Sequence, residues 1–288
     1  MSLRETAGQP CLRLNFISPH FIYLIIYLFI CLFIHLFISR WRTLLSVDDL
    51  VEEVITTLDA GKLLNNTYVI FSSDNGFHLG QFSLPQDKRQ LYEFDVRVPF
   101  MIRGPGLKPK QTSQSPILNI DIAPTIVELA GGKAPESMDG RSILPLLVCS
   151  FEPLFTFFSP RFADVAWRTD FLIQHYGEGE VKIPGCPELS SGVFNCWPNC
   201  VCEDAWNNTY SCVRSVSSKE DMMYCEFEDK EAFLELYDVK KDRHQLKNLN
   251  KDVPPKFLEA KHRRLVDLAT CSGASCRKAY QDGVDTLL

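Results

Sequence analysis

The sequence predicts an α/β fold, and two adjacent stretches of the chain indicate it most clearly. Residues 46–61 carry apolar side chains at helical spacing, and an apolar, β-prone run follows at residues 67–73. A helix that leads directly into a strand is the basic unit of α/β architecture, and so apolar a run predicts a buried strand. The run opens onto Asp74-Asn75-Gly76, so polar side chains are expected where the strand leaves the sheet.

The predicted helix at residues 46–61 has recognisable ends. Ser46 and Asp49 have the spacing of a capping box, and Gly61 is a stop signal. Two adjacent acids, Asp48 and Asp49, also resemble a metal-binding pair. Because acids in a first helical turn complement the helix dipole, we expect them to have a capping role instead.

The elements that follow are shorter. The sequence predicts a strand at residues 98–102 and a helix at residues 121–131. Pro124 falls in the first turn of that helix, where a proline is tolerated. A further strand is expected at residues 167–173. A final helix is indicated by Leu258, Leu265 and Leu268, with Lys261, Arg263 and Arg264 expected on its solvated face.

The chain divides into three predicted segments. Residues 1–42 are an apolar low-complexity segment, residues 43–150 hold the α/β pattern, and residues 151–288 form a smaller cysteine-rich α+β subdomain. Within the first segment, residues 16–39 are long and apolar enough to anchor the chain in a membrane. A Phe-Ile-Tyr-Leu pattern repeats every four residues at 21–36, as a translated TTTA tract would, so a mis-joined simple repeat is the other interpretation.

Cysteine usage indicates an oxidising compartment. Eight of the eleven cysteines fall within residues 186–276, and no histidine follows them at zinc-finger spacing. Cys271 and Cys276 are expected to close a short loop, whereas the other pairings stay open. Two sequons, with acceptors Asn65 and Asn207, agree with glycosylation in the secretory pathway.

The charge balance excludes one class of partner. The formal net charge of −6 argues against a nucleic-acid-binding protein, which needs a basic face.

The turn after the strand at residues 67–73 carries the strongest chemical signal. Oxygen ligands from Asp74 and Asn75 suit a hard cation such as Ca²⁺ or Mg²⁺, and His78 and Lys88 could face an anion held by that cation. The simpler interpretation is a polar turn followed by a solvated lysine.

Several motifs in order resemble the C-terminal half of the catalytic domain of sulfatases. The likeness covers residues 43–147 and again residues 167–276. The motifs are Asp74-Asn75-Gly76-Phe77-His78, Lys88-Arg89-Gln90-Leu91-Tyr92-Glu93, Val96-Arg97-Val98-Pro99 and Arg103-Gly104-Pro105-Gly106.

The resemblance implies an alkaline-phosphatase-like sulfatase core, here the C-terminal part of a mixed sheet with flanking helices, and a closing strand at residues 236–238. It implies a lysosomal hydrolase that removes 6-O-sulfate from N-acetylglucosamine in heparan or keratan sulfate, and hence a sulfated glycosaminoglycan as partner. A sulfated glycan is expected to meet basic side chains drawn from Lys88, Arg89, Arg97 and Arg103.

By the same resemblance, Asp74 and Asn75 are two of the Ca²⁺ ligands and Lys88 contacts the sulfate. His78 is a weaker candidate, either as an active-site contact or proton donor or as a structural hydrogen-bonding residue.

One element of the family pattern does not occur. Sulfatases form their formylglycine nucleophile in a Cys-x-Pro-Ser-Arg type motif. Ser83-Leu84-Pro85 matches part of this motif and then fails at Gln86, and no early apolar strand ends in an Asp-Asp pair. We therefore expect this chain to be inactive alone.

Two other functional classes stay open on the sequence. One is an alkaline-phosphatase-like phosphodiesterase, whose acidic metal ligands also follow strand ends. The other is a non-catalytic, membrane-anchored glycan-binding protein, as residues 16–39 would allow.

Overall fold

The computed structural model describes residues 19–85, 87–148, 167–177, 193–194, 203–204 and 208–277, and these fall into two compact units. The first unit ends at Thr67 and the second begins at Tyr68. For residues 19–34, 36, 37 and 148, and for the two shortest strands, only the backbone is described. Asn207 lies outside the described residues, as do Cys149, Cys186, Cys196, Cys200 and Cys202.

The first unit consists mainly of the long helix α1 (Pro19–Ala60), followed by the 3₁₀ turn η1 (Leu64–Asn66). The helix ends just before Gly61, as predicted. The predicted start at Ser46 is wrong, because the apolar residues before it continue the same helix and leave no free N–H groups there to cap.

The predicted membrane anchor at residues 16–39 finds no support in this structure. Within the part of the chain that is described, no helix combines the length and the apolar character needed to cross a bilayer.

The second unit begins with two short strands. β1 (Val69–Ser72) pairs antiparallel with β2 (Phe100–Arg103), and the register places Ile70 opposite Ile102. Between them lie the 3₁₀ turn η2 (Gln81–Ser83) and the short helix α2 (Glu93–Val96). The expectation of a fully buried β1 is wrong, because its sheet has only these two strands among the described residues and all four of its side chains are half-buried.

The next elements are η3 (Asn119–Asp121), α3 (Ile122–Leu129) and α4 (Leu144–Val148). α3 confirms the helix predicted at residues 121–131. The Asp121 carboxylate is fully buried and accepts hydrogen bonds from the backbone N–H groups of Leu118 and Arg141, both at 2.9 Å. It also pairs with the buried guanidinium of Arg168, so this region is tied to the chain that leads into β3.

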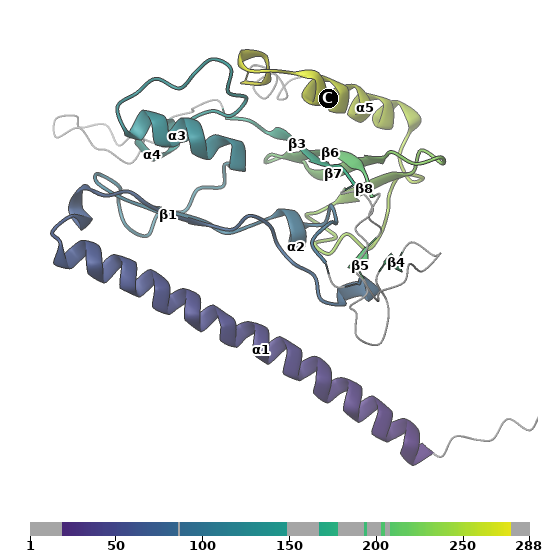
Figure 1. Ribbon diagram of the computed structural model, residues 1–288. Helices are drawn as coiled ribbons and strands as arrows, with labels where there is room; N and C mark the ends of the chain where they lie inside the picture. Colours follow the sequence, from purple (N-terminus) through teal and green to yellow (C-terminus); the bar gives the residue numbers. More distant parts are fainter. Residues whose placement is uncertain are drawn as a thin grey trace, which may run out of the picture. The chain divides into compact units, whose positions relative to one another are not determined.

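The C-terminal subdomain contains a four-stranded antiparallel sheet in the order β3-β6-β7-β8 (Figure 1). β3 and β8 confirm the strands predicted at residues 167–173 and 236–238. The bounds are β3 (Asp170–His175), β6 (Tyr210–Val216), β7 (Asp221–Phe227) and β8 (Leu234–Asp238), and a separate pair is formed by β4 (Val193–Phe194) and β5 (Glu203–Asp204).

Each face of this sheet packs on a different part of the chain because side chains alternate along a strand. One face carries Cys212 and Cys225 and packs against Leu91 and its neighbours around α2. The other face carries Val213 and Leu236 and packs under α5 (Pro255–Thr270), as Figure 1 shows.

Helix α5 confirms the predicted final helix, but its polar pattern differs from the prediction. Of the three basic side chains expected in solvent, only Arg263 is exposed. Lys261 is 1% exposed and pairs with Glu220, and Arg264 binds Asp170 at 3.0 Å. Asp170 at the start of β3 and Glu220 in the turn between β6 and β7 are remote in the sequence, and they pair with these cations and offset the loss of hydration.

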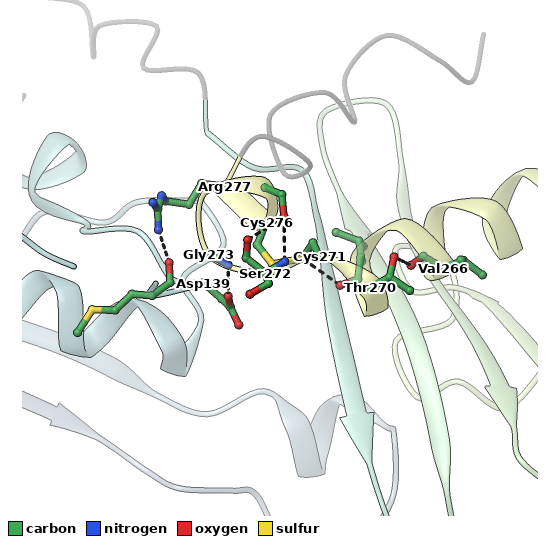
Figure 2. Close-up of a disulfide and its surroundings, with 11 residues drawn as sticks. Asp139, Val266, Thr270, Cys271, Ser272, Gly273, Cys276 and Arg277 are labelled. Carbon is green, nitrogen blue, oxygen red and sulfur yellow. Dashed lines mark hydrogen bonds between the residues drawn. A yellow bond between two sulfur atoms is a disulfide. The ribbon is translucent and has the colours of Figure 1, made fainter. Parts of the chain in front are cut away.

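Two disulfides are described. Cys212 and Cys225 join directly opposed positions of β6 and β7, and Cys271 and Cys276 close the short loop predicted from the sequence. In Figure 2 this loop faces the segment around Asp139, whose carboxylate accepts a hydrogen bond from the Gly273 N–H at 2.5 Å. Gly273 has φ +56°, and a Cβ there would lie 2.6 Å from the Glu136 carbonyl oxygen, so the close approach requires glycine.

The sheet face toward α2 contains a carboxyl group whose burial affects stability. Glu235 is 7% exposed, and burial raises the pKa of its carboxyl while hydrogen bonds from the Tyr237 and Tyr92 hydroxyls oppose that rise. A raised pKa gives stability that is present below the ordinary carboxyl pKa and is lost as the pH rises through the raised value. Burial also raises the pKa of Asp170, which acts in the same direction.

We predict that Glu235→Gln makes the free energy of unfolding less dependent on pH between about pH 4 and pH 7, because the variant has no buried charge to create. Urea unfolding across this range measures the effect. Glu231→Gln, the same change at an exposed position, should keep the wild-type slope. An unchanged slope in the Glu235 variant would show that this group does not titrate as described.

We predict that the double variant Cys271→Ser with Cys276→Ser lowers the free energy of unfolding by about 2 kcal/mol, because the short loop loses its cross-link. The Gly273 amide should also exchange faster with solvent, since the loop no longer holds it against Asp139. Equal stability of the variant and the oxidised wild type would contradict the prediction.

Candidate functional site

The turn Asp74-Asn75-Gly76 leaves the end of β1 and packs directly on helix α2. The Gly76 N–H donates to the Asp95 carbonyl at 2.7 Å, and the Phe77 N–H donates to the Phe94 carbonyl at 3.2 Å. A Cβ at position 76 would lie 1.8 Å from the Phe94 carbonyl oxygen. Glycine is therefore required at this position, and the turn that carries Asp74 and Asn75 is fixed against α2.

His78 lies at the centre of this arrangement and is fully buried. Its Nδ1 lies 2.9 Å and 2.7 Å from the two carboxylate oxygens of Asp95, which is also buried. The same carboxylate accepts the Gln90 N–H at 3.0 Å. The pair thus joins the turn after β1 to the segment that follows Lys88, and His78 is not among the residues that line the cavity described below.

Asp74 and Asn75 offer oxygen atoms at the end of β1. The Asp74 Oδ1 accepts the Asn75 N–H at 2.9 Å, and the Asn75 side-chain amide donates to the Gly76 carbonyl at 2.7 Å. This second bond directs the amide N–H group into the turn, so the amide oxygen is available for a cation. The donor types therefore fit a hard cation, although two residues supply fewer than the six to eight oxygens that Ca²⁺ takes. No cluster of three or more His, Cys, Asp or Glu side chains suited to a metal occurs among the described residues.

Lys88 is exposed, while the backbone around it is firmly held. Asp87 and His78 exchange two backbone hydrogen bonds, at 2.9 Å and 3.2 Å, and the Asp87 carboxylate accepts the Lys88 N–H at 2.7 Å. The Asp87 carboxylate also pairs with Arg89 at 2.7 Å. The lysine side chain thus extends from a rigid loop.

The three predicted site residues Asp74, Asn75 and Lys88 line one cavity of about 1580 Å³. The cavity also runs past Arg97 and Arg103, and its wall includes Glu93 and Arg214. The lining of this cavity therefore contains both carboxylate and cationic groups, which are the two kinds of group that a bound cation and its anion use.

Sequence reasoning missed the groups that hold the site in place. The missed groups are buried or half-buried around α2: they are Asp95, Glu93, and the two partners of Glu93, Arg214 and Gln245. Glu93 belongs to a motif that was recognised, but its partners lie more than 100 residues away in the chain, at separations of 121 and 152 residues. Local sequence gives no signal for such pairs.

Of the two predicted glycosylation sites, Asn65 is exposed in η1. The Thr67 hydroxyl of that sequon donates to the Leu63 carbonyl at 2.8 Å. Asn65 is therefore accessible to modification, whereas Asn207 lies outside the described residues.

The chain is similar to known proteins. Residues 29–132 match the family model for sulfatases, a range that includes the turn at Asp74, the buried His78–Asp95 pair and Lys88.

Two curated relatives are similar over most of the chain. N-acetylglucosamine-6-sulfatase from Bos taurus is 50% identical over 241 residues, which cover 83% of this chain and 41% of the relative. The Homo sapiens protein of the same name is 49% identical over 241 residues, or 83% of this chain and 42% of the relative. The chain thus spans about two fifths of the length of these relatives.

Among solved structures, BT4656 in complex with its substrate D-glucosamine-2-N,6-O-disulfate matches with a TM-score of 0.58. It covers 84% of this chain, this chain covers 40% of it, and the sequence identity is 24%, so the match bears on the fold alone. The fold is that of the C-terminal part of an alkaline-phosphatase-like sulfatase core with a cysteine-rich C-terminal subdomain. With a sulfatase family match across the site and half of the aligned residues identical to mammalian sulfatases, the chain belongs to the sulfatase family.

Proposed function

We propose that this chain forms the cation- and sulfate-binding part of a sulfatase site that acts on 6-O-sulfated N-acetylglucosamine in glycosaminoglycans such as heparan or keratan sulfate. The observation that carries the proposal is the shared cavity, whose lining includes Asp74, Asn75 and Lys88. The 50% identity to N-acetylglucosamine-6-sulfatase of Bos taurus supports the choice of substrate.

Sulfatases generally use a metal ion, and we assign Ca²⁺ to Asp74 and Asn75. A carboxylate and a neutral amide oxygen are hard ligands of the kind Ca²⁺ prefers. A bound cation would polarise the sulfate and stabilise negative charge on its oxygens. The protein's own part is to hold these two side chains on a turn whose Gly76 packs closely against the backbone of α2.

Lys88 is assigned to the sulfate itself. Its ammonium carries three N–H donors and is exposed, so it can neutralise the charge of the sulfate oxygens without first giving up a buried partner. The fixed backbone of the loop reduces the conformational entropy that binding has to remove.

His78 is assigned a positioning role in this proposal. Its full burial and its contacts with Asp95 support the structural interpretation over the alternative as an active-site contact or proton donor. Its function would then be to keep the Asp74 turn and the Lys88 loop in one arrangement.

The proposal assigns this chain the binding of cation and sulfate and does not assign it turnover, since its sequence contains no Cys-x-Pro-Ser-Arg motif. The exposed Asn65 sequon and the disulfides support passage through the secretory pathway, and we place the protein in the lysosome.

We predict that the chain binds N-acetylglucosamine 6-sulfate in the presence of Ca²⁺ and that Lys88→Met weakens this binding about tenfold, because one charge-assisted contact is lost. Asp74→Asn should weaken Ca²⁺ binding and, with it, the Ca²⁺-dependent part of sugar binding. Titration followed by NMR gives both dissociation constants.

The matched control is Lys251→Met, an exposed lysine that does not line the cavity and should leave both constants unchanged. Equal binding by wild type and the Lys88 variant would overturn the assignment of Lys88. Equal binding of unsulfated N-acetylglucosamine would overturn the assignment of the site to sulfate.

A further inference from the structure

A strand of the C-terminal sheet, β6, contacts helix α2, which begins a few residues after Lys88. We propose that Arg214 of β6 is a positioning residue for Lys88, acting through its contact with Glu93 at the start of α2. The inference rests on the proposed role of Lys88 as the sulfate contact and adds the residue that keeps Lys88 directed into the cavity.

The contacts of Arg214 fix its side chain in one orientation. Arg214 is 5% exposed, and the Nε of its guanidinium donates to the Glu93 carboxylate at 2.9 Å. Its Nη2 lies 2.6 Å from the Asp221 carboxylate, and its Nη1 donates to the carbonyls of Ser215 at 2.9 Å and Met222 at 3.2 Å. A planar group with every nitrogen engaged resists rotation, which a lysine with its single ammonium could not match.

Glu93 links Arg214 to the candidate site. Its carboxylate meets Arg214, and its backbone N–H donates to the side-chain oxygen of Gln245 at 2.8 Å. Gln245 also belongs to the C-terminal subdomain and is 4% exposed. Two independent bonds from one subdomain therefore anchor the first residue of α2.

The backbone between Glu93 and Lys88 transmits this anchoring. Leu91 is fully buried against the sheet, and the Gln90 N–H is bound by the Asp95 carboxylate within α2. The Asn208 side chain donates to the Arg89 carbonyl at 3.2 Å. With so many contacts on residues 89–95, a shift of α2 is expected to move Lys88 as well.

Two other roles for Arg214 need to be distinguished from positioning. Arg214 lines the cavity, so it could contact the ligand directly. It could also serve overall stability alone. A direct contact or a general effect on stability would act independently of Lys88, whereas a positioning residue acts through Lys88, and a double-mutant cycle separates these cases.

The test uses the full chain and the variants Arg214→Met, Glu93→Gln, Lys88→Met and the double variant K88M/R214M. Hydrogen–deuterium exchange without ligand reports on residues 88–97. NMR titration with N-acetylglucosamine 6-sulfate and Ca²⁺ gives the dissociation constants, and circular dichroism checks that each variant is folded. Glu93→Gln, alone and combined with Lys88→Met, removes the same ion pair while keeping the size of the side chain, so it decides the question if Arg214→Met does not fold.

We expect Arg214→Met and Glu93→Gln each to speed amide exchange in residues 88–97 about tenfold and to weaken binding about fivefold. In the Lys88→Met background, Arg214→Met should change the dissociation constant by less than about twofold. Unchanged exchange in the folded variants, or losses that multiply in the double variant, would overturn the proposal. If Lys88→Met binds the sugar as well as wild type does, the proposed function fails, and the exchange rates still decide whether Arg214 holds the loop.

Discussion

The buried pair of His78 and Asp95 is the interaction on which the rest of the site depends. A carboxylate with 2% exposure has to be paired or hydrogen-bonded to be tolerated, and Asp95 meets this requirement with the His78 ring and the Gln90 N–H. Its backbone carbonyl accepts the Gly76 N–H as well. One residue of α2 thereby contacts both the turn with the oxygen ligands and the loop with the lysine, and a shift of either would leave buried polar groups without their hydrogen-bond partners.

Buried ion pairs also join other segments that are remote in the sequence. Asp121 and Arg168 form a buried pair that connects η3 to the approach to β3, and Lys261 of α5 pairs with Glu220 in the turn between β6 and β7. Buried ion pairs contribute little net stability, but removing one partner is costly, so they favour one arrangement over others. The Asp121–Arg168 pair connects the C-terminal subdomain to the preceding region, and the Lys261–Glu220 pair holds α5 on the sheet.

Much of the secondary structure could be predicted from the sequence because periodicity reflects burial. The helix that ends before Gly61, the strand before Asp74, α3 and α5 follow from apolar spacing and stop signals alone. The start of α1 could not be predicted, because a capping pattern at Ser46 does not begin a helix where the preceding residues are already helical. Lys261 was assigned to solvent for a related reason, since its position in the helix does not reveal the acid that pairs with it from another element.

For the candidate site, the residue types were predictable and their support was not. Asp74, Asn75 and Lys88 stand out as polar groups after a strand, and the structure brings them to one cavity. The residues that hold them, above all Arg214 and Gln245, are more than 100 positions away from Glu93 and carry no local signal. Three-dimensional structure was needed to find them.

The most direct test of this account is a crystal structure of the chain with Ca²⁺ and N-acetylglucosamine 6-sulfate. The account predicts the cation on the side-chain oxygens of Asp74 and Asn75, with the sulfate between the cation and the Lys88 ammonium and with the His78–Asp95 pair intact behind them. A sulfate bound away from Lys88, or a cation that does not touch Asp74, would contradict it.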